Sequence, residues 1–485
     1  MNRIAEDGTK IQEIISSLFW LFAERCGAQG VSFIVSIILA RLLAPEVYGT
    51  IALVTVFTAV LQVFVDSGMG NALIQKKNAD DRDFSTVFYF NMTVCCVLYL
   101  GMYHAAPYIA EFYNDGELTA VVRVLSLTLV ISGVKNVQQA YVSRNMLFKH
   151  FFYATLGGTI GAAAMGITMA YMGYGVWALV IQQVFNAAAD TVILWITVKW
   201  RPGRTFSLQK LKGLFSFGWK MLVSGLLDTV YGNLRQLLVG KIYSSSDLAY
   251  YNRGQQFPNF IVNNINSSID SVLFPVMSSV QDDREKIKNM TRKSIKISVY
   301  VMAPMMMGLA FTAETVVRLV LTDKWLACVP FLRIFSVTCM FHPIHTANLN
   351  AIKAMGRSDL FLKLEILKKV VGLVLMISSI QFGVLAMAYS MLIGNVISQV
   401  INSWPNRKLL GYSYEDQIKD ILPCILLAAF MGGCVYTITF LELSLMATLC
   451  MQVVSGALVY IVCSAILKMS SFLYLWDIVK IIVHR

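Results

Sequence analysis

The sequence is dominated by long apolar stretches, and each is long enough to cross a lipid bilayer. A transmembrane helix needs about 20 consecutive residues that are mostly apolar, and the 485-residue chain holds about fourteen stretches of that length. Charged residues make up only 14% of the chain and hydrophobic residues 57%, whereas a soluble domain has about 25% charged residues. We therefore predict an all-α polytopic membrane protein with about 14 transmembrane helices.

The predicted spans differ in how apolar they are. The seventh and eighth are the most polar and the least certain from hydropathy alone. The fourteen spans cover residues 18–40, 50–72, 84–105, 120–141, 151–172, 176–198, 213–240, 250–276, 294–313, 327–349, 360–381, 384–404, 419–440 and 445–467.

Lys and Arg are distributed unevenly over the loops between these spans. With the N-terminus in the cytoplasm, the cytoplasmic segments hold about 27 Lys and Arg, and the opposite side holds about 5. This asymmetry predicts that both termini are cytoplasmic. The net charge of +12 follows mostly from this bias, so we expect no nucleic-acid partner.

The chain repeats itself weakly at an interval of about 200 residues. "LARLLAPEVYG", which begins at Leu39, matches "VGKIYSSSDLAYY", which begins at Val239, and "GVWAL" at Gly175 matches "GVLAM" at Gly383. We predict two six-helix lobes around a central cavity, as in transporters built from parallel repeats. The predicted parts are an N-terminal lobe (1–198, spans 1–6), a C-terminal lobe (199–404, spans 7–12), and a segment with spans 13–14 and a cytoplasmic C-terminus (405–485).

Polar side chains form stripes along four of these apolar spans. At 100° per residue, the stripes of spans seven and eight each cover about 80° of their helix. Their members are Arg25 and Gln29 in span one, Gln62 and Asp66 in span two, Lys220, Asp228 and Arg235 in span seven, and Asn252, Gln256, Asn259, Asn263, Asn266 and Asp270 in span eight, with Arg253 beside the last stripe.

The stripes predict a water-filled cavity, because each polar group in lipid costs free energy unless it meets water or a partner. The simpler alternative is that they join helices by hydrogen bonds. Amides and hydroxyls suit sugar hydroxyls, and Arg and Lys suit phosphate. A path with both kinds of group indicates a glycan that carries phosphate.

Asp66 and Asp270 lie near the cytoplasmic ends of spans two and eight. Arg25 and Lys220 lie at a similar depth, so acids and bases of the two lobes could pair when the cavity closes. Protonation of an acid would release its base and couple transport to a proton gradient. The alternative is that both acids cap helix ends or pair with loop lysines such as Lys76.

The sequence contains little that indicates catalysis, a metal or a cofactor. The loops are too short for a soluble catalytic domain, and no phosphate-binding loop motif is present. His342 and His345 stand three residues apart, but polar packing explains them more simply than metal binding. We therefore expect a protein that is not an enzyme and binds no cofactor and no metal. No secretory signal peptide is visible.

Several motifs carry a resemblance to a known family. "LARLLAPEVYG", "FSFGWKML", "LAYYNRGQQFPN", "LFPVMSSVQDDREK" and "AMGRSDLFLKLEILKKVVG" resemble the Wzx-type polysaccharide flippases of the multidrug/oligosaccharidyl-lipid/polysaccharide exporter superfamily. The match looks closest to the branch of colanic acid and teichuronic acid exporters. It covers most of residues 15–420.

The resemblance implies a flippase in the bacterial cytoplasmic (inner) membrane. It implies that an undecaprenyl-pyrophosphate-linked oligosaccharide repeat unit is moved across that membrane by alternating access, driven by an ion gradient. The protein would be a monomer in contact with membrane lipid and with other polysaccharide assembly proteins. The resemblance has no invariant motif to transfer, so it assigns only a general role in binding the anionic head group to Arg25, Lys220, Arg235 and Arg253.

Three other functions stay open. A membrane enzyme that polymerises or ligates lipid-linked glycans would need a larger outer loop than this chain has. A drug/cation antiporter of the same superfamily would favour acidic groups in the cavity. A scaffold protein of a glycan assembly complex would not need the polar stripes.

Overall fold

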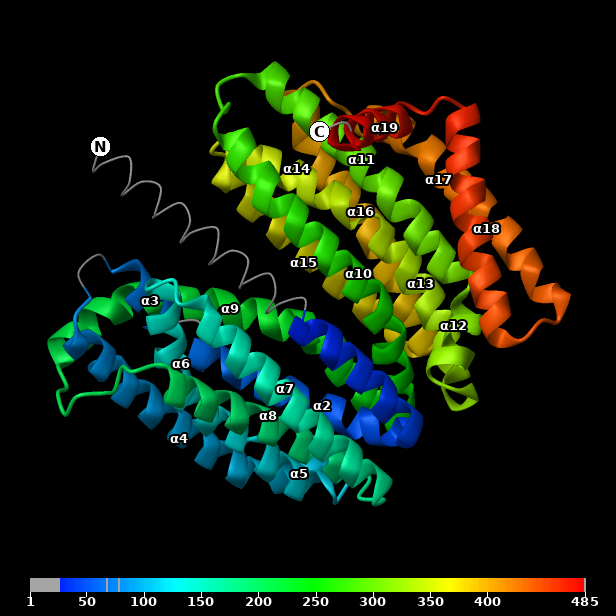
Figure 1. The fold of residues 1–485 in the computed structure, drawn as a ribbon. Coiled ribbons are helices and arrows are strands. Elements are labelled where there is room, and N and C mark those ends of the chain that lie inside the picture. Colours follow the sequence, from blue (N-terminus) through cyan, green and yellow to red (C-terminus); the bar gives the residue numbers. More distant parts are fainter. Residues whose placement is uncertain (1–26, 67–68, 77–78, 484–485) are drawn as a thin grey trace. The chain divides into compact units, whose positions relative to one another are not determined.

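A computed structural model describes residues 27–66, 69–76 and 79–483, and the regular elements within these ranges are all helices. The helices form two compact units, which divide between Ala249 and Tyr250. Figure 1 colours the helices in chain order from blue to red.

The first unit contains a helix at Gly27–Leu42 followed by eight labelled helices. These are α2 (Pro45–Asp66), α3 (Met69–Gln75), α4 (Asp81–Tyr113), α5 (Leu118–Leu125), α6 (Leu127–Arg144), α7 (Phe148–Tyr171), α8 (Val176–Thr197) and α9 (Leu208–Ile242). The boundary of the two units falls in the first turns of the next helix, α10 (Ser245–Ser278).

The second unit contains the rest of α10 and nine further α-helices, joined in three places by short 3₁₀ turns. The elements are α11 (Arg284–Phe311), α12 (Ala313–Val320), η1 (Asp323–Cys328), α13 (Val329–Met340), α14 (His342–Ala354), α15 (Ser358–Ser379), η2 (Ile380–Phe382), α16 (Val384–Leu409), α17 (Tyr414–Thr437), η3 (Ile438–Leu441), α18 (Leu445–Ile466) and α19 (Ser470–Val483).

Each of the fourteen predicted spans coincides with helix in the described residues, which confirms the all-α membrane fold. Ten of these helical segments are long and apolar enough to cross a membrane. The long helices α9, α10 and α15 fall outside that set because they carry more polar residues. The fourth span is divided between α5 and α6 at Ser126, and the tenth between α13 and α14 at Phe341. Hydropathy does not reveal these breaks.

The boundary of the two units does not coincide with the predicted lobe boundary at residues 198/199. Helix α9 packs against α2, α3 and α4, so its contacts belong to the first unit. The predicted repeat has a local counterpart, however. Gly175 precedes α8 and Gly383 precedes α16, and both have a positive φ, of 52° and 95°. The matched motifs therefore start their helices from the same kind of backbone conformation, one that glycine adopts without steric cost.

Small residues bring α7 and α8 together. In a membrane, apolar contact alone does not select helix partners, because lipid is as apolar as leucine, and small residues allow close approach. A Cβ atom on Gly158 would lie 3.2 Å from the backbone nitrogen of Asp190, and one on Gly166 would lie 3.0 Å from the Gln182 side chain. The glycines of α7 between Gly157 and Gly166 thus serve helix packing.

Ion pairs fix the loops that precede α4 and α9. Asp80 caps the N-terminus of α4, and its carboxylate accepts hydrogen bonds from Lys210 Nζ at 2.6 Å. This contact lowers the pKa of the Asp80 carboxyl below its usual value. Lys76 Nζ lies 2.7 Å from the buried carboxylate of Asp83. Lys76 therefore pairs with Asp83 rather than with Asp66.

The closest approach at a glycine in the first unit lies between α2 and the start of α10. A Cβ atom on Gly49 would lie 1.8 Å from the Ser245 carbonyl oxygen. The Ser246 hydroxyl beside it donates to Glu46 at 2.8 Å. This junction has no room for another atom.

We expect Gly49→Ala to destabilise the protein, because the added methyl group would displace backbone and not a flexible side chain. Overpacking of this kind costs about 1–3 kcal/mol. The change is measured as a shift in melting temperature, with size-exclusion chromatography in detergent as the monitor of thermal unfolding. Gly101→Ala in α4 is the matched control, since a Cβ there meets nothing within 4 Å. Equal melting temperatures for the two variants would contradict the tight junction.

Candidate functional site

The structure describes most but not all of the residues that the sequence places in the transport path. Arg25 lies outside the described residues. Gln29 lies on the helix Gly27–Leu42 with its side chain exposed. Lys220 lies in α9, but its side chain is outside the described part of the chain.

Helix α9 carries the other two members of its predicted stripe. Asp228 is exposed and Arg235 is half-buried. Between them in the sequence, the Asn233 amide donates a hydrogen bond to the Thr229 carbonyl of the same helix at 2.8 Å. Asp228 and Arg235 lie seven residues apart, close to two helical turns, so they share one side of α9.

Helix α10 packs on the second unit through one of its sides. Val262 is buried there, and Ile261 and Ile265 pack against the same apolar cluster. Gly254 permits close contact with α13, since a Cβ atom on it would lie 2.6 Å from the Phe331 side chain. The exposed members of the stripe, Asn263 and Asp270, therefore lie on a different side of α10 from these apolar residues.

The first part of the α10 stripe is packed into the second unit. Arg253 is only 5% exposed. Its guanidinium donates to the Gln256 side chain and lies 5.0 Å from the centre of the Trp325 ring. Cation–π contact of this kind stabilises a buried guanidinium. Arg253 is thus held by neighbours within its own unit, and it also positions the Gln256 amide.

The stripe becomes more exposed further along α10. The Asn259 side-chain oxygen accepts a weak hydrogen bond from the Cys339 thiol at 3.5 Å. Asn263 is exposed, and Asn266 is half-buried. The side-chain oxygen of Asn266 is buried and has no hydrogen-bond partner in the described part of the chain. Asn263 is therefore the amide of this group whose side chain is most open to a ligand.

Asp270 ends the stripe and is held by one amide. The Asn350 side chain of α14 donates to its carboxylate at 2.7 Å. Asn350 is completely buried, whereas Asp270 is exposed. The contact joins the eighth predicted span to the tenth.

Asp66 has an equivalent partner in the first unit. Its carboxylate accepts from the Gln62 amide at 2.9 Å and from Asn136 of α6 at 3.5 Å. Asn136 in turn accepts from Asn91 of α4 at 3.1 Å. This contact joins the second predicted span to the fourth. Each unit therefore has an aspartate that accepts a hydrogen bond from an asparagine, and the two contacts lie in corresponding parts of the predicted repeat.

Sequence reasoning missed one ion pair in the first unit. Lys135 Nζ of α6 lies 2.8 Å from the Asp190 carboxylate of α8, and both side chains are mostly buried. The spans of Lys135 and Asp190 hold few charged residues. Two residues of opposite charge in such spans are the sequence signal that could have revealed the pair. Stripe analysis overlooked them, although Gln182, Asn186 and Asp190 recur at every fourth residue of α8.

His345 makes hydrogen bonds to two amides of α16. Asn402 donates to the Nδ1 atom of His345 at 3.0 Å, and the Nε2 atom of His345 contacts the side-chain oxygen of Asn395. No group of three or more His, Cys, Asp or Glu side chains in the described residues could hold a metal ion. The arrangement agrees with polar packing between helices.

Taken together, the site residues offer amide groups in a row along α10 and one amide-bound carboxylate in each unit. Amides both donate and accept hydrogen bonds, as sugar hydroxyls do. A carboxylate held by a neutral amide can gain or lose a proton without leaving a buried cation unpaired.

Comparison with known proteins places the chain in a family. Residues 38–330 match the family model described as "Polysaccharide biosynthesis protein". The teichuronic acid biosynthesis protein TuaB of Bacillus subtilis (strain 168) is 25% identical over 83% of this chain and 85% of that protein. The succinoglycan biosynthesis transport protein ExoT of Rhizobium meliloti (strain 1021) is 24% identical over 66% of this chain and 65% of that protein.

A solved structure shares the fold. The lipid II flippase MurJ in an inward closed conformation superposes with a TM-score of 0.74 at 14% identity, over 93% of this chain and 98% of that chain. Together with the family match, this likeness confirms the resemblance that the sequence motifs predict. The chain belongs to the polysaccharide biosynthesis protein family, and it is a multi-pass membrane protein.

Proposed function

We propose that this protein moves a lipid-linked oligosaccharide across the membrane. The observation that carries the proposal is the row of amides on α10, which runs from the packed part of the helix to the exposed Asn263. A protein that only anchors an assembly complex would not need such a row. The family match and the flippase fold support the same function.

Within this function we assign the glycan path to Gln29, Asp228, Gln256, Asn259, Asn263 and Asn266. Their amides and carboxylate suit sugar hydroxyls, which donate and accept hydrogen bonds. Asn263 supports the assignment most directly, because its side chain is exposed on the stripe.

The phosphate of the substrate would be bound by cationic side chains. Arg25, Lys220 and Arg235 are the candidates, because Arg and Lys are the natural phosphate ligands. Arg253 differs from them, since it is buried against Trp325. We assign it the supporting role of orienting Gln256.

The two amide-bound carboxylates would couple transport to a proton gradient. Asp66 and Asp270 each accept from an asparagine, and no cation of the described residues lies at hydrogen-bond distance from either carboxylate. In this proposal a base of the path pairs with each acid in one state of the protein and leaves it in the other. Alternating access would follow from the change in pairing.

The proposed setting is the bacterial inner membrane, with both termini in the cytoplasm. The Lys and Arg asymmetry of the loops supports this orientation. The substrate would be an undecaprenyl-pyrophosphate-linked repeat unit for a surface polysaccharide. We propose that the protein acts as a monomer without catalysing a reaction, beside other assembly proteins.

Deletion of the gene followed by lipid analysis tests the function. A flippase mutant accumulates complete lipid-linked repeat units on the cytoplasmic side and loses surface polymer. A polymerase mutant would instead change the polymer that the repeat units form. A ligase mutant would change the molecule to which the units are joined. Normal surface polymer in the deletion strain, without accumulated units, would contradict the proposal.

Replacing the exposed amides tests the glycan path. Asn263→Leu and Asn266→Leu should insert normally, because they make α10 more apolar, yet they should block export. Asn264→Leu is the matched control on the same helix. Asn264 donates to the Phe260 carbonyl of its own helix at 2.7 Å and lies outside the stripe. Export assays in a deletion strain, with protein amounts measured by blotting, give the result. Equal loss of export in all three variants would contradict the assignment of this face of α10 to the glycan path.

The acid pairs are tested by pH-dependent transport. Asp66→Asn and Asp270→Asn should each slow export about 5- to 30-fold, as expected for 1–2 kcal/mol of lost pairing. They should also flatten its dependence on the proton gradient. The conservative Asp66→Glu and Asp270→Glu should keep that dependence, because the carboxylate remains. If the Asn variants respond to the gradient like the parent, the acids do not couple transport.

The cationic residues are tested by neutralisation. Arg25→Ala and Lys220→Ala should weaken export, whereas Arg25→Lys should retain part of it because the charge remains. Binding of the lipid-linked substrate to purified protein gives an independent readout. Wild-type export by both Ala variants at normal protein amounts would show that neither residue binds the phosphate.

A further inference from the structure

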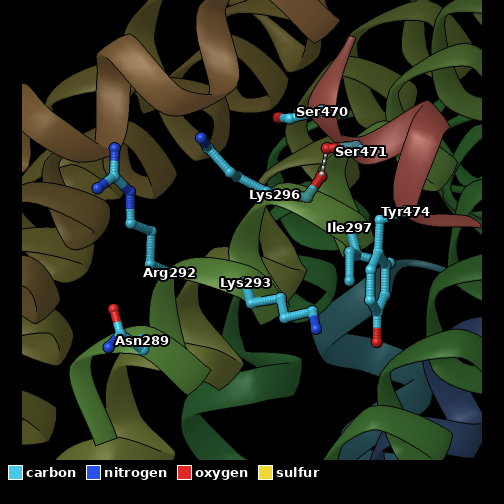
Figure 2. A pocket seen from close by; sticks show the side chains of 8 residues that line it. All are labelled: Asn289, Arg292, Lys293, Lys296, Ile297, Ser470, Ser471 and Tyr474. Carbon is cyan, nitrogen blue, oxygen red and sulfur yellow. Dashed lines mark hydrogen bonds between the residues drawn. The ribbon is translucent and has the colours of Figure 1, made fainter. Parts of the chain in front are cut away.

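A pocket of about 420 Å³ lies between α11 and α19 in the second unit. Its size falls within the range of small-molecule sites, about 300–1,000 Å³. Figure 2 shows Lys293 of α11 pointing toward Tyr474 of α19, whereas the Arg292 and Lys296 side chains point to the other side. The lining residues are Asn289, Arg292, Lys293, Lys296, Ile297, Ser470, Ser471 and Tyr474.

The pocket has an excess of positive charge. Arg292 and Lys296 share one carboxylate, that of Asp420 of α17, at 2.6 Å and 2.9 Å. The Tyr412 hydroxyl also donates to Asp420 at 2.9 Å. One carboxylate thus faces two cations, which leaves a net positive charge before Lys293 is counted.

Lys293 adds a cation that no acid neutralises. Its ammonium lies 3.6 Å from the centre of the Tyr474 ring. No carboxylate lies within ion-pair distance of it in the described part of the chain. Ser470 and Ser471 bring hydroxyl groups to the same pocket, and Ser471 contacts the Lys296 carbonyl at 3.4 Å. Ammonium, guanidinium and hydroxyl groups together are typical ligands of a phosphate group.

The position of the pocket favours a lipid over a dissolved anion. Arg292, Lys293 and Lys296 lie within one helical turn of residue 294, where the ninth predicted span begins. On α19, Phe472 and Leu475 pack against the core of the unit, whereas Leu473 and Trp476 remain exposed. A short helix with exposed Leu and Trp after the last span is typical of a helix at the membrane interface. The pocket is therefore expected at the level of the lipid head groups.

We propose that this pocket binds the phosphate diester of an anionic phospholipid such as phosphatidylglycerol. Lys293 contributes the charge that is free to bind it, and Arg292, Lys296 and the serines complete the site. The bound lipid would fix α19 against α11. This site is separate from the proposed glycan path, and its test does not depend on transport.

Native mass spectrometry of the full-length protein in a neutral detergent tests the proposal. The probes are phosphatidylglycerol and phosphatidylcholine with identical acyl chains. The wild type should prefer phosphatidylglycerol. Lys293→Gln should weaken phosphatidylglycerol binding about fivefold, the effect of one basic residue near anionic lipid, and leave phosphatidylcholine binding unchanged. Lys293→Arg should restore the preference.

Lys288→Gln is the matched control, because Lys288 lies on the same helix outside the pocket. Equal phosphatidylglycerol affinities of the Lys293→Gln and Lys288→Gln variants would overturn the proposal. Displacement of phosphatidylglycerol by millimolar inorganic phosphate would overturn the lipid assignment in favour of a dissolved anion. An acidic peptide that binds more tightly than phosphatidylglycerol would instead assign the pocket to a protein partner.

Discussion

The cost of an unpaired polar group in hydrocarbon governs this structure. No water in the bilayer core compensates a buried amide or charge, so each must find a partner, a cavity or the interface. Lys135 meets Asp190 in this way, and Asn402 meets His345. On α10, Asn259 meets Cys339 of the core, whereas Asn263 remains exposed. We propose that the exposed part of this row meets water and substrate.

The same constraint gives the aspartate–asparagine contacts their significance. Asp66 and Asp270 lie in matching predicted spans, and each meets an amide from the span two further along. A neutral amide supports either protonation state of a carboxyl group, whereas a fixed cation would hold it ionised. We propose that these two sites in corresponding places make the two units respond to protons. Lys76 does not pair with Asp66, because it pairs with Asp83.

Much of the fold follows from the sequence, because the length of an apolar stretch is set by the thickness of the bilayer. Ten of the helical segments at the predicted spans satisfy that rule by length and apolar composition. The breaks at Ser126 and Phe341 depend on packing with other helices, so hydropathy could not reveal them. The Lys135–Asp190 pair joins residues 55 positions apart. A single sequence, read by itself, does not show that two such distant residues are in contact. Burial of Arg253 against Trp325 was equally hidden, because helical periodicity locates a face and not what covers it.

The central claim is that this chain moves a lipid-linked glycan from one leaflet to the other without changing it chemically. The most direct measurement uses proteoliposomes with a lipid-linked oligosaccharide whose outer-leaflet fraction is cleaved by an added, impermeant glycosidase. With the protein present and a pH gradient imposed, the protected fraction should fall below that of protein-free vesicles, and the lipid should keep its mass. An unchanged protected fraction, or a lipid of altered mass before the glycosidase is added, would contradict the account.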